Sequence, residues 1–359
     1  MAATDADADD RDDARTDAAD AARLSTLRSR LRLVVDGHEA GMRLDQFLAK
    51  RCPWRSRTKI EELIRQGQVE MVGRSARPSR KVWAHETILV RLPRPKRELD
   101  LHRAGAPATL DVLHEDRDLI AVNKPPDIPV HPGGRLLEDT VITRLHERFG
   151  VGAPGFDPET GIVPKLCHRL DLETSGVLLV AKSDPVAAEM GRQMRGRETI
   201  KEYLALVHGT VRDETFVIDA PIGDHPTSLV ANRRAVVPGG SPSRTGVTVE
   251  RRYRDFTLVR CRLWTGRRHQ IRCHLHHAGF PLVGDKIYGL DESYFLAYYE
   301  ERLDDAMRTR LMLPRQALHA ERLVVAHPRG GDPLAVRAPL WPDFAELLAT
   351  LAPAAPVTS

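Results

Sequence analysis

The chain has few cysteines and no run of apolar residues long enough to span a bilayer. Its 359 residues include four cysteines and no C-x-x-C pair, which favours free thiols in a reducing cytoplasm: Cys52, Cys167, Cys261 and Cys273. The N-terminal residues are acidic and lack the apolar core of a secretory signal. No internal repeat is evident. These absences leave the composition of a soluble cytoplasmic protein, 42% hydrophobic and 29% charged, with enough residues for two domains.

Charge is distributed unevenly along the chain. Residues 1–23 hold eight Asp and three Arg, a net charge of −5 against a total of +4, so the rest of the chain carries +9. Residues 42–98 alone hold fifteen Lys or Arg against six Asp or Glu. A basic segment that dense indicates a polyanionic partner, although a solvated basic face is the commoner origin of a charge run.

Composition divides the chain into five segments. Residues 1–24, rich in Ala and Asp, predict a disordered acidic tail because they bury too little apolar surface to fold. A small domain is expected over 25–92, followed by a proline-containing linker over 93–108. A larger domain over 109–352 and a C-terminal tail over 353–359 complete the chain.

The small domain is predicted to combine short strands with two helices. Leu44, Phe47 and Leu48 recur at helical spacing, and Ser56 is placed to cap a second helix that ends at Gly67. Strands are expected at 31–35, 69–72 and 87–90, with an arginine-rich loop at 73–80. The second helix carries basic side chains that can neutralise phosphates, namely Arg57, Lys59 and Arg65.

More strands than helices are predicted in the larger domain, several of them in succession, which favours a mostly antiparallel α+β core. An amphipathic helical insertion is expected at 290–316, and a mobile or RNA-facing loop at 224–244. The remaining elements are expected as strands at 110–116, 119–124, 177–182, 199–209, 215–218, 246–253, 256–263 and 318–325, and as helices at 140–149, 183–195, 267–278 and 343–351.

The stretch 168–176, His-Arg-Leu-Asp-Leu-Glu-Thr-Ser-Gly, leads into the short apolar strand at 177–182. It places Asp171 on the turn before a buried strand, two residues after Arg169. Burial raises the pKa of a carboxyl group, and a nearby positive charge holds the group ionised. Such a carboxylate suits catalysis, but structural ion pairs occupy the same kind of place, so spacing alone leaves both interpretations open.

Two further side chains have a chemical and a structural interpretation. Tyr203 lies on a strand of period two, where a buried phenol commonly belongs to the core and finds a polar partner. Arg272 lies beside the apolar stripe of the helix that follows Gly266, a place that suits an ion pair. For both residues the pattern alone does not decide between a role in the core and a role in chemistry.

Metal and serine-hydrolase chemistry find little support. Potential ligands one to four positions apart on a helix converge poorly, and no second cluster completes a tetrahedral site around Cys273, His274, His276 and His277. Ser175 is not part of a G-x-S-x-G elbow. We therefore expect neither a metal site nor a serine nucleophile.

Several blocks of the larger domain resemble the RluA-type pseudouridine synthases, from about residue 110 to 350. The stretch 168–182 resembles the central motif of that family. Asn123-Lys124-Pro125 resembles another block of the family. The next two residues, Pro126-Asp127, depart from the family, which often has a small residue and glycine there. The small domain resembles the S-four-like RNA-binding domain. The other blocks that resemble the family, in the expected order, are 130–133, 201–209, 265–275, 279–289 and 316–320; the segment 290–316 is long.

The resemblance implies a pseudouridine synthase fold and an enzyme that isomerises uridine in RNA with no cofactor. Asp171 would be the nucleophile or base that starts the reaction, and Arg272 would pair with it. Tyr203 would take the proton from uracil carbon 5, and Arg169 would fill the space left by the flipped-out base. Further RNA contacts are expected from His168, Thr174, Arg267, His269, Gln270 and Lys124, and from Arg57, Lys59 and Arg65 in the small domain.

RNA is therefore the expected partner, with no membrane and no required protein partner. The S-four-like domain resembles that of members acting on large-subunit (23S) ribosomal RNA, which is preferred over transfer RNA. One alternative is a ribosome-assembly factor that binds RNA without turnover, and another is a metal-dependent RNA hydrolase that a chelator would inactivate. Whether Asp171 attacks the base, attacks the sugar or abstracts a ribose proton stays open.

Overall fold

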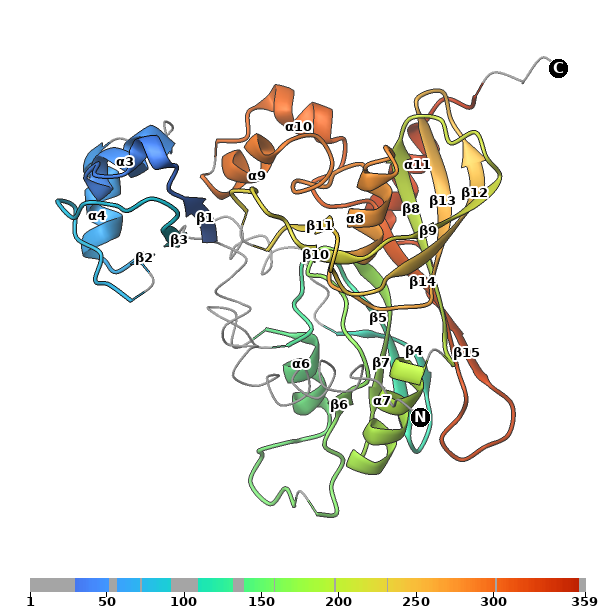
Figure 1. Cartoon of the computed structure of the whole chain (residues 1–359). Helices are drawn as coiled ribbons and strands as arrows, with labels where there is room; N and C mark the ends of the chain where they lie inside the picture. Colours follow the sequence, from blue (N-terminus) through green and yellow to red (C-terminus); the bar gives the residue numbers. More distant parts are fainter. Residues whose placement is uncertain are drawn as a thin grey trace, which may run out of the picture. The chain divides into compact units, whose positions relative to one another are not determined.

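The structure, a computed structural model, describes residues 30–51, 57–71, 73–91, 109–131, 139–157, 159–196, 198–230, 232–300 and 302–354 (Figure 1). The expected acidic tail, the linker and the cap Ser56 lie outside these ranges. The chain divides into a small unit, Met1–Pro95 with His225–Arg233, and a large unit, Lys96–Asp224 with Arg234–Ser359. None of the helices in the described ranges has the length and apolar character needed to cross a membrane.

The small unit combines a three-stranded antiparallel sheet with two helices, as the sequence predicts. The strands run in the order β1 (Arg30–Val34), β3 (Thr87–Arg91) and β2 (Val69–Met71). Before the helices α3 (Leu44–Arg51) and α4 (Arg57–Arg65) lies the short 3-10 helix η2 (Gly37–Glu39). Apolar residues at helical spacing form the buried faces of the two helices, namely Leu44, Phe47, Leu48, Ile60, Leu63 and Ile64.

A ten-stranded sheet organises the large unit. Its strand pairs in the described ranges are antiparallel except for the pair of β7 and β14, which is parallel. The predicted mostly antiparallel α+β core is therefore confirmed. The order is β4 (Asp111–Glu115), β5 (Leu119–Lys124), β7 (Ser175–Ala181), β14 (Leu318–Val325), β8 (Ile200–His208), β13 (Phe256–Leu263), β12 (Arg244–Arg252) and β9 (Thr215–Asp219), with β6 (Lys165–Leu166) on β7 and β15 (Leu334–Arg337) on β14.

Strand β7 is buried along its whole length because helices cover both of its faces. Leu179 packs in one core cluster with Met190 of α7 (Asp184–Gly196). Leu178 belongs to another cluster, with Leu145 of α6 (Val141–Arg148). A strand covered on both faces needs apolar side chains at every position, which explains the continuous apolar run after residue 176.

Two expectations for irregular segments need correction. The segment 224–244 is not one loop, because β10 (Ile222–Asp224) and β11 (Arg234–Val236) pair as an antiparallel hairpin. The insertion 290–316 contains the helices α9 (Glu292–Tyr299) and α10 (Asp305–Leu311). Four consecutive residues of α9, 294–297, are buried, so this helix is covered on several sides and is not amphipathic.

Two further helices of the large unit are ones that the sequence predicts. Helix α8 (Gln270–His277) follows β13 after a short loop, and Ile271 and Leu275 insert into the core cluster formed with β8, β12 and β13. Helix α11 (Pro342–Thr350) buries Phe344 in a separate cluster with Leu206 of β8. Because α8 packs against the middle of the sheet, polar side chains on its first turns lie near the strands that carry the candidate site.

Candidate active site

Asp171 lies in the turn that leads into β7, in the middle of the large sheet. The backbone N–H of Thr174 donates to the Asp171 carbonyl at 3.1 Å, and that of Asp127 donates to the Leu172 carbonyl at 2.9 Å. Gly176 has a φ of +112°, and a Cβ there would lie 2.2 Å from the Ala320 carbonyl oxygen of β14. The turn is therefore held closely against the sheet, and the Asp171 side chain is 19% exposed.

Arg272, on α8, makes the predicted pair with Asp171. Its Nη1 donates to Oδ2 of Asp171 at 3.0 Å, while Nε and Nη2 donate to the two oxygens of Asp285 at 2.6 and 2.9 Å. Arg272 is 5% exposed and Asp285 is fully buried. Burial by itself would lower the pKa of Arg272, but the charges of Asp285 and Asp171 raise it. The guanidinium is therefore a permanent positive charge with a fixed orientation.

Asp285 is a functional candidate that sequence reasoning missed. Besides both nitrogens of Arg272, its carboxylate accepts the backbone N–H groups of Ile287 and Tyr288 at 2.9 and 3.1 Å. Burial alone would raise the pKa of Asp285, but the positive charge of Arg272 and these hydrogen bonds lower it. The sequence holds one signal that could have identified Asp285. It is the lone acid that follows Gly284 in a largely apolar block that resembles the family.

Tyr203 lies on β8, opposite Cys261 of β13 and Ala320 of β14. Its partly buried ring packs against core clusters on the two sides of the strand. Burial and the charge of Asp171 raise the pKa of Tyr203, so the side chain is a neutral phenol at physiological pH. The contribution of Asp171 means that the phenol and the carboxylate lie within electrostatic range of each other. The structure thus brings together Asp171, Tyr203 and Arg272.

His269 links this group to Tyr288. It has a φ of +55° directly before α8, and its Nδ1 lies 3.0 Å from the Tyr288 hydroxyl. Its Nε2 lies 3.9 Å from Oδ2 of Asp171. The Tyr288 ring also lies 5.0 Å from the guanidinium carbon of Arg272. His269 is buried and directly faces the candidate catalytic carboxylate, so its place agrees with a role at the reacting base.

The side-chain amide of Gln270 holds the loop before α8. Its Oε1 accepts from the Thr265 hydroxyl at 2.8 Å and from the Arg267 backbone N–H at 3.0 Å. Its Nε2 donates to the Thr245 hydroxyl and to the Arg244 carbonyl, both at 3.0 Å. These four bonds use the amide in full, and the side chain is buried. Gln270 therefore positions the loop, and its contact with RNA stays a prediction.

Lys124 and Thr174 are also buried, with hydrogen-bond partners inside the protein, and their RNA contacts stay predictions. The Lys124 ammonium donates to three backbone carbonyls, those of Pro125, Ile128 and Leu172, at 2.7, 3.0 and 2.9 Å. The Thr174 hydroxyl accepts from Nε2 of Gln316 at 2.9 Å. A buried ammonium is stable only when hydrogen bonds replace its water, and these bonds tie two loops together beside Asp171.

His168 has a comparable structural role. Its Nε2 accepts the backbone N–H of Leu179 at 3.0 Å, which requires an unprotonated nitrogen at that position. Burial, and then the charge of Lys201, lower the pKa of His168 to about 3. The imidazole is therefore neutral and connects the start of the 168–176 stretch to the middle of β7.

The remaining predicted RNA contacts involve accessible side chains. Arg169 is exposed, and Arg267 is partly exposed with its Nε 3.5 Å from the Pro242 carbonyl. In the small unit, Arg57 pairs with the buried Asp45 at 2.7 Å and Arg65 pairs with Glu61 at 2.9 Å. Both arginines remain more than half exposed, so their outer edges can meet phosphate. The side chain of Lys59 lies outside the described part of the structure.

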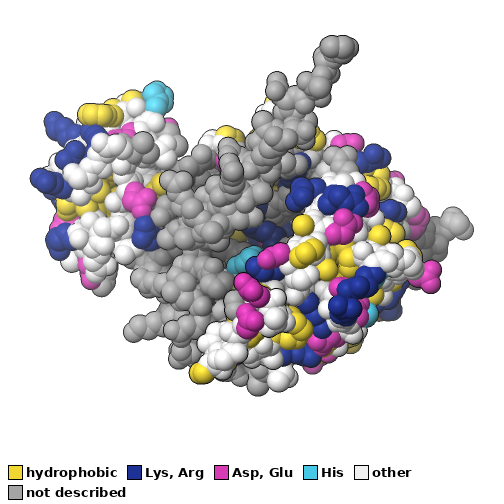
Figure 2. All heavy atoms as spheres, turned by 90° about the horizontal axis from the view of Figure 1, so that it is seen from below, with side chains coloured by type: hydrophobic (Ala, Val, Ile, Leu, Met, Phe, Trp, Pro, Cys, Tyr) yellow, Lys and Arg dark blue, Asp and Glu magenta, His cyan; other side chains and the backbone are white. Residues whose placement is uncertain are grey.

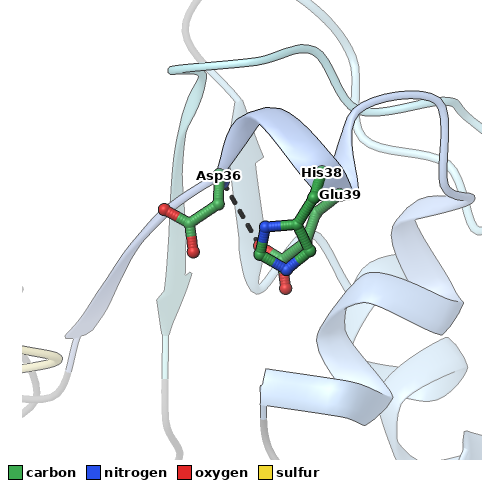
Figure 3. Close-up of side chains that lie close together, drawn as sticks. All are labelled: Asp36, His38 and Glu39. Atoms are coloured by element: carbon green, nitrogen blue, oxygen red, sulfur yellow. Dashed lines mark hydrogen bonds between the residues drawn. The ribbon is translucent and has the colours of Figure 1, made fainter.

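His274, one of the side chains of α8 that suggest metal ligands, makes other contacts. The two ring nitrogens of His274 lie 2.8 Å from the Thr245 hydroxyl and 3.0 Å from the Ala220 carbonyl. Elsewhere in the described ranges, Asp36, His38 and Glu39 place oxygen and nitrogen atoms close together (Figure 3). The Asp36 backbone N–H donates to Glu39 there, and Arg51 pairs with both carboxylates. Another such group is Asp116, Asp118 and His327.

Comparison with known proteins identifies the two parts of the chain. Residues 118–277 match the family described as RNA pseudouridylate synthase, and residues 42–88 match the S4 domain. A ribosomal large subunit pseudouridine synthase D from Nitrosomonas europaea is 38% identical over 320 residues, which are 89% of this chain and 87% of that protein. A protein of the same name from Xanthomonas campestris is 34% identical over 320 residues, 89% of this chain and 91% of its own.

A solved structure agrees with these sequence matches. The human RNA pseudouridylate synthase domain containing 1 is 27% identical, with a TM-score of 0.53, and the match covers 71% of this chain and 93% of that one. The class is therefore a pseudouridine synthase in which an S4 RNA-binding domain precedes the catalytic domain. The chain belongs to the RluA family of RNA pseudouridylate synthases. The predicted family, fold class and isomerase activity are confirmed.

Proposed function

We propose that this enzyme converts specific uridines of large-subunit (23S) ribosomal RNA to pseudouridine, with Asp171 as the catalytic carboxylate. The observation that carries the assignment of Asp171 is its 3.0 Å hydrogen bond to the buried Arg272. Support for the RNA class comes from the S4 domain and from relatives named ribosomal large subunit pseudouridine synthase D. Since these relatives are bacterial, we propose the cytoplasm, where bacterial ribosomes are assembled, as the site of action.

The reaction rearranges bonds within one nucleotide. The glycosidic bond between ribose C1′ and uracil N1 breaks, and a bond between C1′ and uracil C5 forms. C5 loses its hydrogen and N1 gains one, so the product is an isomer of the substrate. A carboxylate near the ribose and C6 can start this change by attack on the sugar or base, or by removal of a ribose proton. Asp171 is the accessible carboxylate of the site.

Arg272 supports the carboxylate without taking part in proton transfer. Its pKa is raised by Asp285 and Asp171, so it cannot act as an acid or base near neutral pH. Two of its nitrogens are held by Asp285, which aims the third at Oδ2 of Asp171. A positioned positive charge favours the ionised form of the Asp171 carboxylate and fixes its orientation.

Tyr203 is the candidate group for the C5 proton. Its raised pKa means that it begins as a phenol, so its oxygen can take up the C5 proton only if the phenolic proton leaves. Asp171 lies within electrostatic range and is a negatively charged acceptor for that proton once its bond to the substrate has been released. The apolar surroundings that raise the pKa of Tyr203 also exclude water from the detached uracil.

The target uridine must leave its helix to reach Asp171. Flipping a base out of a stack costs a few kcal/mol, and contacts of Lys and Arg with phosphates offset this cost. Arg169 is exposed and lies two residues before Asp171, a position from which a guanidinium can replace the missing base. Arg267, on the loop before α8, is a second basic side chain that can contact the RNA near the flipped nucleotide.

The direct test replaces Asp171 by Asn, which preserves size and removes the charge. We expect tritium release from RNA labelled at uracil C5 to fall by about 100-fold or more, while RNA binding remains. The exposed Asp213, replaced by Asn, is the matched control. Transcripts of 23S ribosomal RNA and of transfer RNA as alternative substrates decide the RNA class. Near-normal tritium release by the Asp171→Asn variant would remove Asp171 from the chemistry.

A further inference from the structure

Trp83 in the small unit is the most exposed large hydrophobic side chain among the described residues. It is 61% exposed, whereas Val82, its neighbour in sequence, is fully buried in the core of the unit. The apolar residues of this unit's helices are buried as well. The core of the unit is thus complete without the indole, and an aromatic ring of that size left in water needs another explanation.

One face of the Trp83 indole lies on an arginine that the protein holds in place. The guanidinium carbon of Arg74 is 3.6 Å from the ring centroid. Arg74 donates to both carboxylate oxygens of Glu86, at 3.0 and 2.9 Å, and to the Lys81 carbonyl at 3.0 Å. Arg74 and Glu86 are 14% and 8% exposed. Because one face is covered and the ring is still 61% exposed, the opposite face and the edges of the indole are open to solvent.

The backbone around Trp83 is fixed as firmly as its ring. Its N–H donates to the Glu86 carboxylate at 3.0 Å, and its carbonyl accepts the Glu86 N–H at 3.2 Å. On the other side, Val82 exchanges hydrogen bonds with Gly41 and Met42, at 2.8 and 2.9 Å. A flat aromatic surface that is already ordered loses little conformational entropy when a ligand stacks on it.

The surroundings of Trp83 are basic rather than apolar. Residues 73–86 hold four cationic side chains and one acid, and that acid, Glu86, is paired with Arg74. Arg77 and Lys81 are exposed, and Arg80 is partly exposed. Figure 2 shows Lys and Arg side chains among hydrophobic ones on the small unit, at left. A protein-binding hot spot usually has apolar neighbours, whereas an aromatic ring among cations is typical of single-stranded nucleic acid binding.

We propose that Trp83 is a stacking platform for an unpaired base of the RNA substrate, with the cationic side chains of residues 73–81 on the adjacent phosphates. An unpaired base offers a free face to the indole, whereas bases within a duplex are covered by their neighbours. Arg74, beneath the ring, adds a cation–π contact that orients the indole. The inference rests on the proposed function in that the ligand is RNA.

The test compares Trp83→Ala with Trp83→Phe in the full-length enzyme. The probes are a short single-stranded RNA and the same strand annealed to its complement. Loss of stacking on an aromatic side chain weakens single-strand binding by about 5- to 150-fold, so we expect a loss in this range for Trp83→Ala. Trp83→Phe keeps a ring and should lose much less. Quenching of indole fluorescence by the single strand should occur in the wild type and be reduced in Trp83→Phe.

Salt dependence separates stacking from charge. Trp83→Ala should lower the affinity without changing the slope of the logarithm of the binding constant against the logarithm of salt concentration. Lys81→Gln should reduce this slope by about 0.7 if its ammonium contacts a phosphate of the single strand. The exposed Val217 of the large unit, replaced by Ala, is the matched apolar control. Because the indole is outside the core, circular dichroism should show that Trp83→Ala folds normally.

The outcomes distinguish this inference from the proposed enzyme activity. Equal single-strand affinity of Trp83→Ala and wild type overturns the stacking platform, even if tritium release confirms the role of Asp171. An equal loss of duplex and single-strand binding also overturns it, because stacking requires an uncovered base. If Asp171→Asn retains activity while Trp83→Ala loses single-strand affinity, the catalytic proposal fails and the platform stands.

Discussion

Arg272 donates a hydrogen bond to Asp171 at 3.0 Å although 101 positions separate the two residues in the sequence. The turn before β7 supplies the carboxylate and the first half of α8 supplies the guanidinium. The sheet positions both, because β7 lies centrally in it and α8 packs on the cluster that includes β8 and β13. The site therefore depends on tertiary packing rather than on local sequence, and its geometry can be disturbed from residues that do not touch the substrate.

Replacing Asp285 by Asn should reduce catalysis without weakening RNA binding. The amide leaves the buried Arg272 with one counter-charge fewer and one acceptor fewer, so the bond to Asp171 loses its alignment. Misplacement of a catalytic group by about 1 Å can cost about 100-fold in rate, and breaking a buried ion pair costs about 3–5 kcal/mol of stability. Single-turnover tritium release and urea unfolding measure the two effects.

Asp118 provides the comparison for Asp285. It is also nearly buried and pairs with an arginine, Arg329, with both oxygens, but it lies between β4 and β5. Asp118→Asn should lower stability and leave the single-turnover rate of the folded enzyme unchanged. A normal rate in Asp285→Asn would show that Arg272 does not need its second carboxylate to orient Asp171.

Replacing Tyr203 by Phe removes one oxygen and preserves the packing of the ring against its two core clusters. RNA binding should stay near normal, while release of the C5 proton should slow by about 100- to 10,000-fold, the usual range for loss of an acid–base group. Tyr253, buried near the end of β12, is the matched control as Tyr253→Phe. Unchanged turnover in Tyr203→Phe would return this residue to the purely structural interpretation.

The sequence predicts an element well where its residue pattern fits only one kind of secondary structure. The apolar run after residue 176 gives β7, and the spacing of Leu44, Phe47 and Leu48 gives α3. It fails where the outcome depends on packing from elsewhere. Helix α9 is buried on several sides, which its residue periodicity does not predict. The hairpin of β10 and β11 consists of strands of three residues, too short for a periodic signal.

The site shows the same division. Asp171, Tyr203 and Arg272 are found from motifs, because each stands in a block that resembles the family. Asp285 is missed because its importance arises from the two nitrogens of Arg272 that it binds. The burial of Lys124 is likewise not predicted by its residue pattern, which indicates only the end of a strand before two prolines. Only the three carbonyls that converge on its ammonium reveal a buried cation.

Replacing Lys124 by Met tests its structural role. The thioether side chain fits the space but leaves three buried carbonyls without their donor, and each unsatisfied group costs about 1–3 kcal/mol. We expect lower stability in urea unfolding and unchanged RNA affinity of the folded protein. Arg65→Met should show the reverse pattern, because its surface pair with Glu61 contributes little stability and its exposed charge suits phosphate. Reduced RNA affinity in a fully folded Lys124→Met variant would contradict the structural assignment.

Protonation of His168 should make the enzyme less stable in acid. The pKa of a histidine in an unfolded chain is about 6.5, whereas burial and Lys201 lower that of His168 to about 3 in the folded protein. Between these two values the unfolded state binds the additional proton, so stability is full above pH 6.5 and declines as the pH falls toward 3. Protonation also removes the acceptor for the Leu179 N–H, which connects the stretch 168–176 to β7.

His168→Asn should therefore show a shallower loss of unfolding free energy between pH 7 and 4, measured by urea unfolding at each pH. The same replacement at the exposed His277 is the matched control for the exchange of histidine for asparagine. Equal slopes for His168→Asn and wild type would mean that the imidazole takes up its proton in the folded protein as readily as in the unfolded chain.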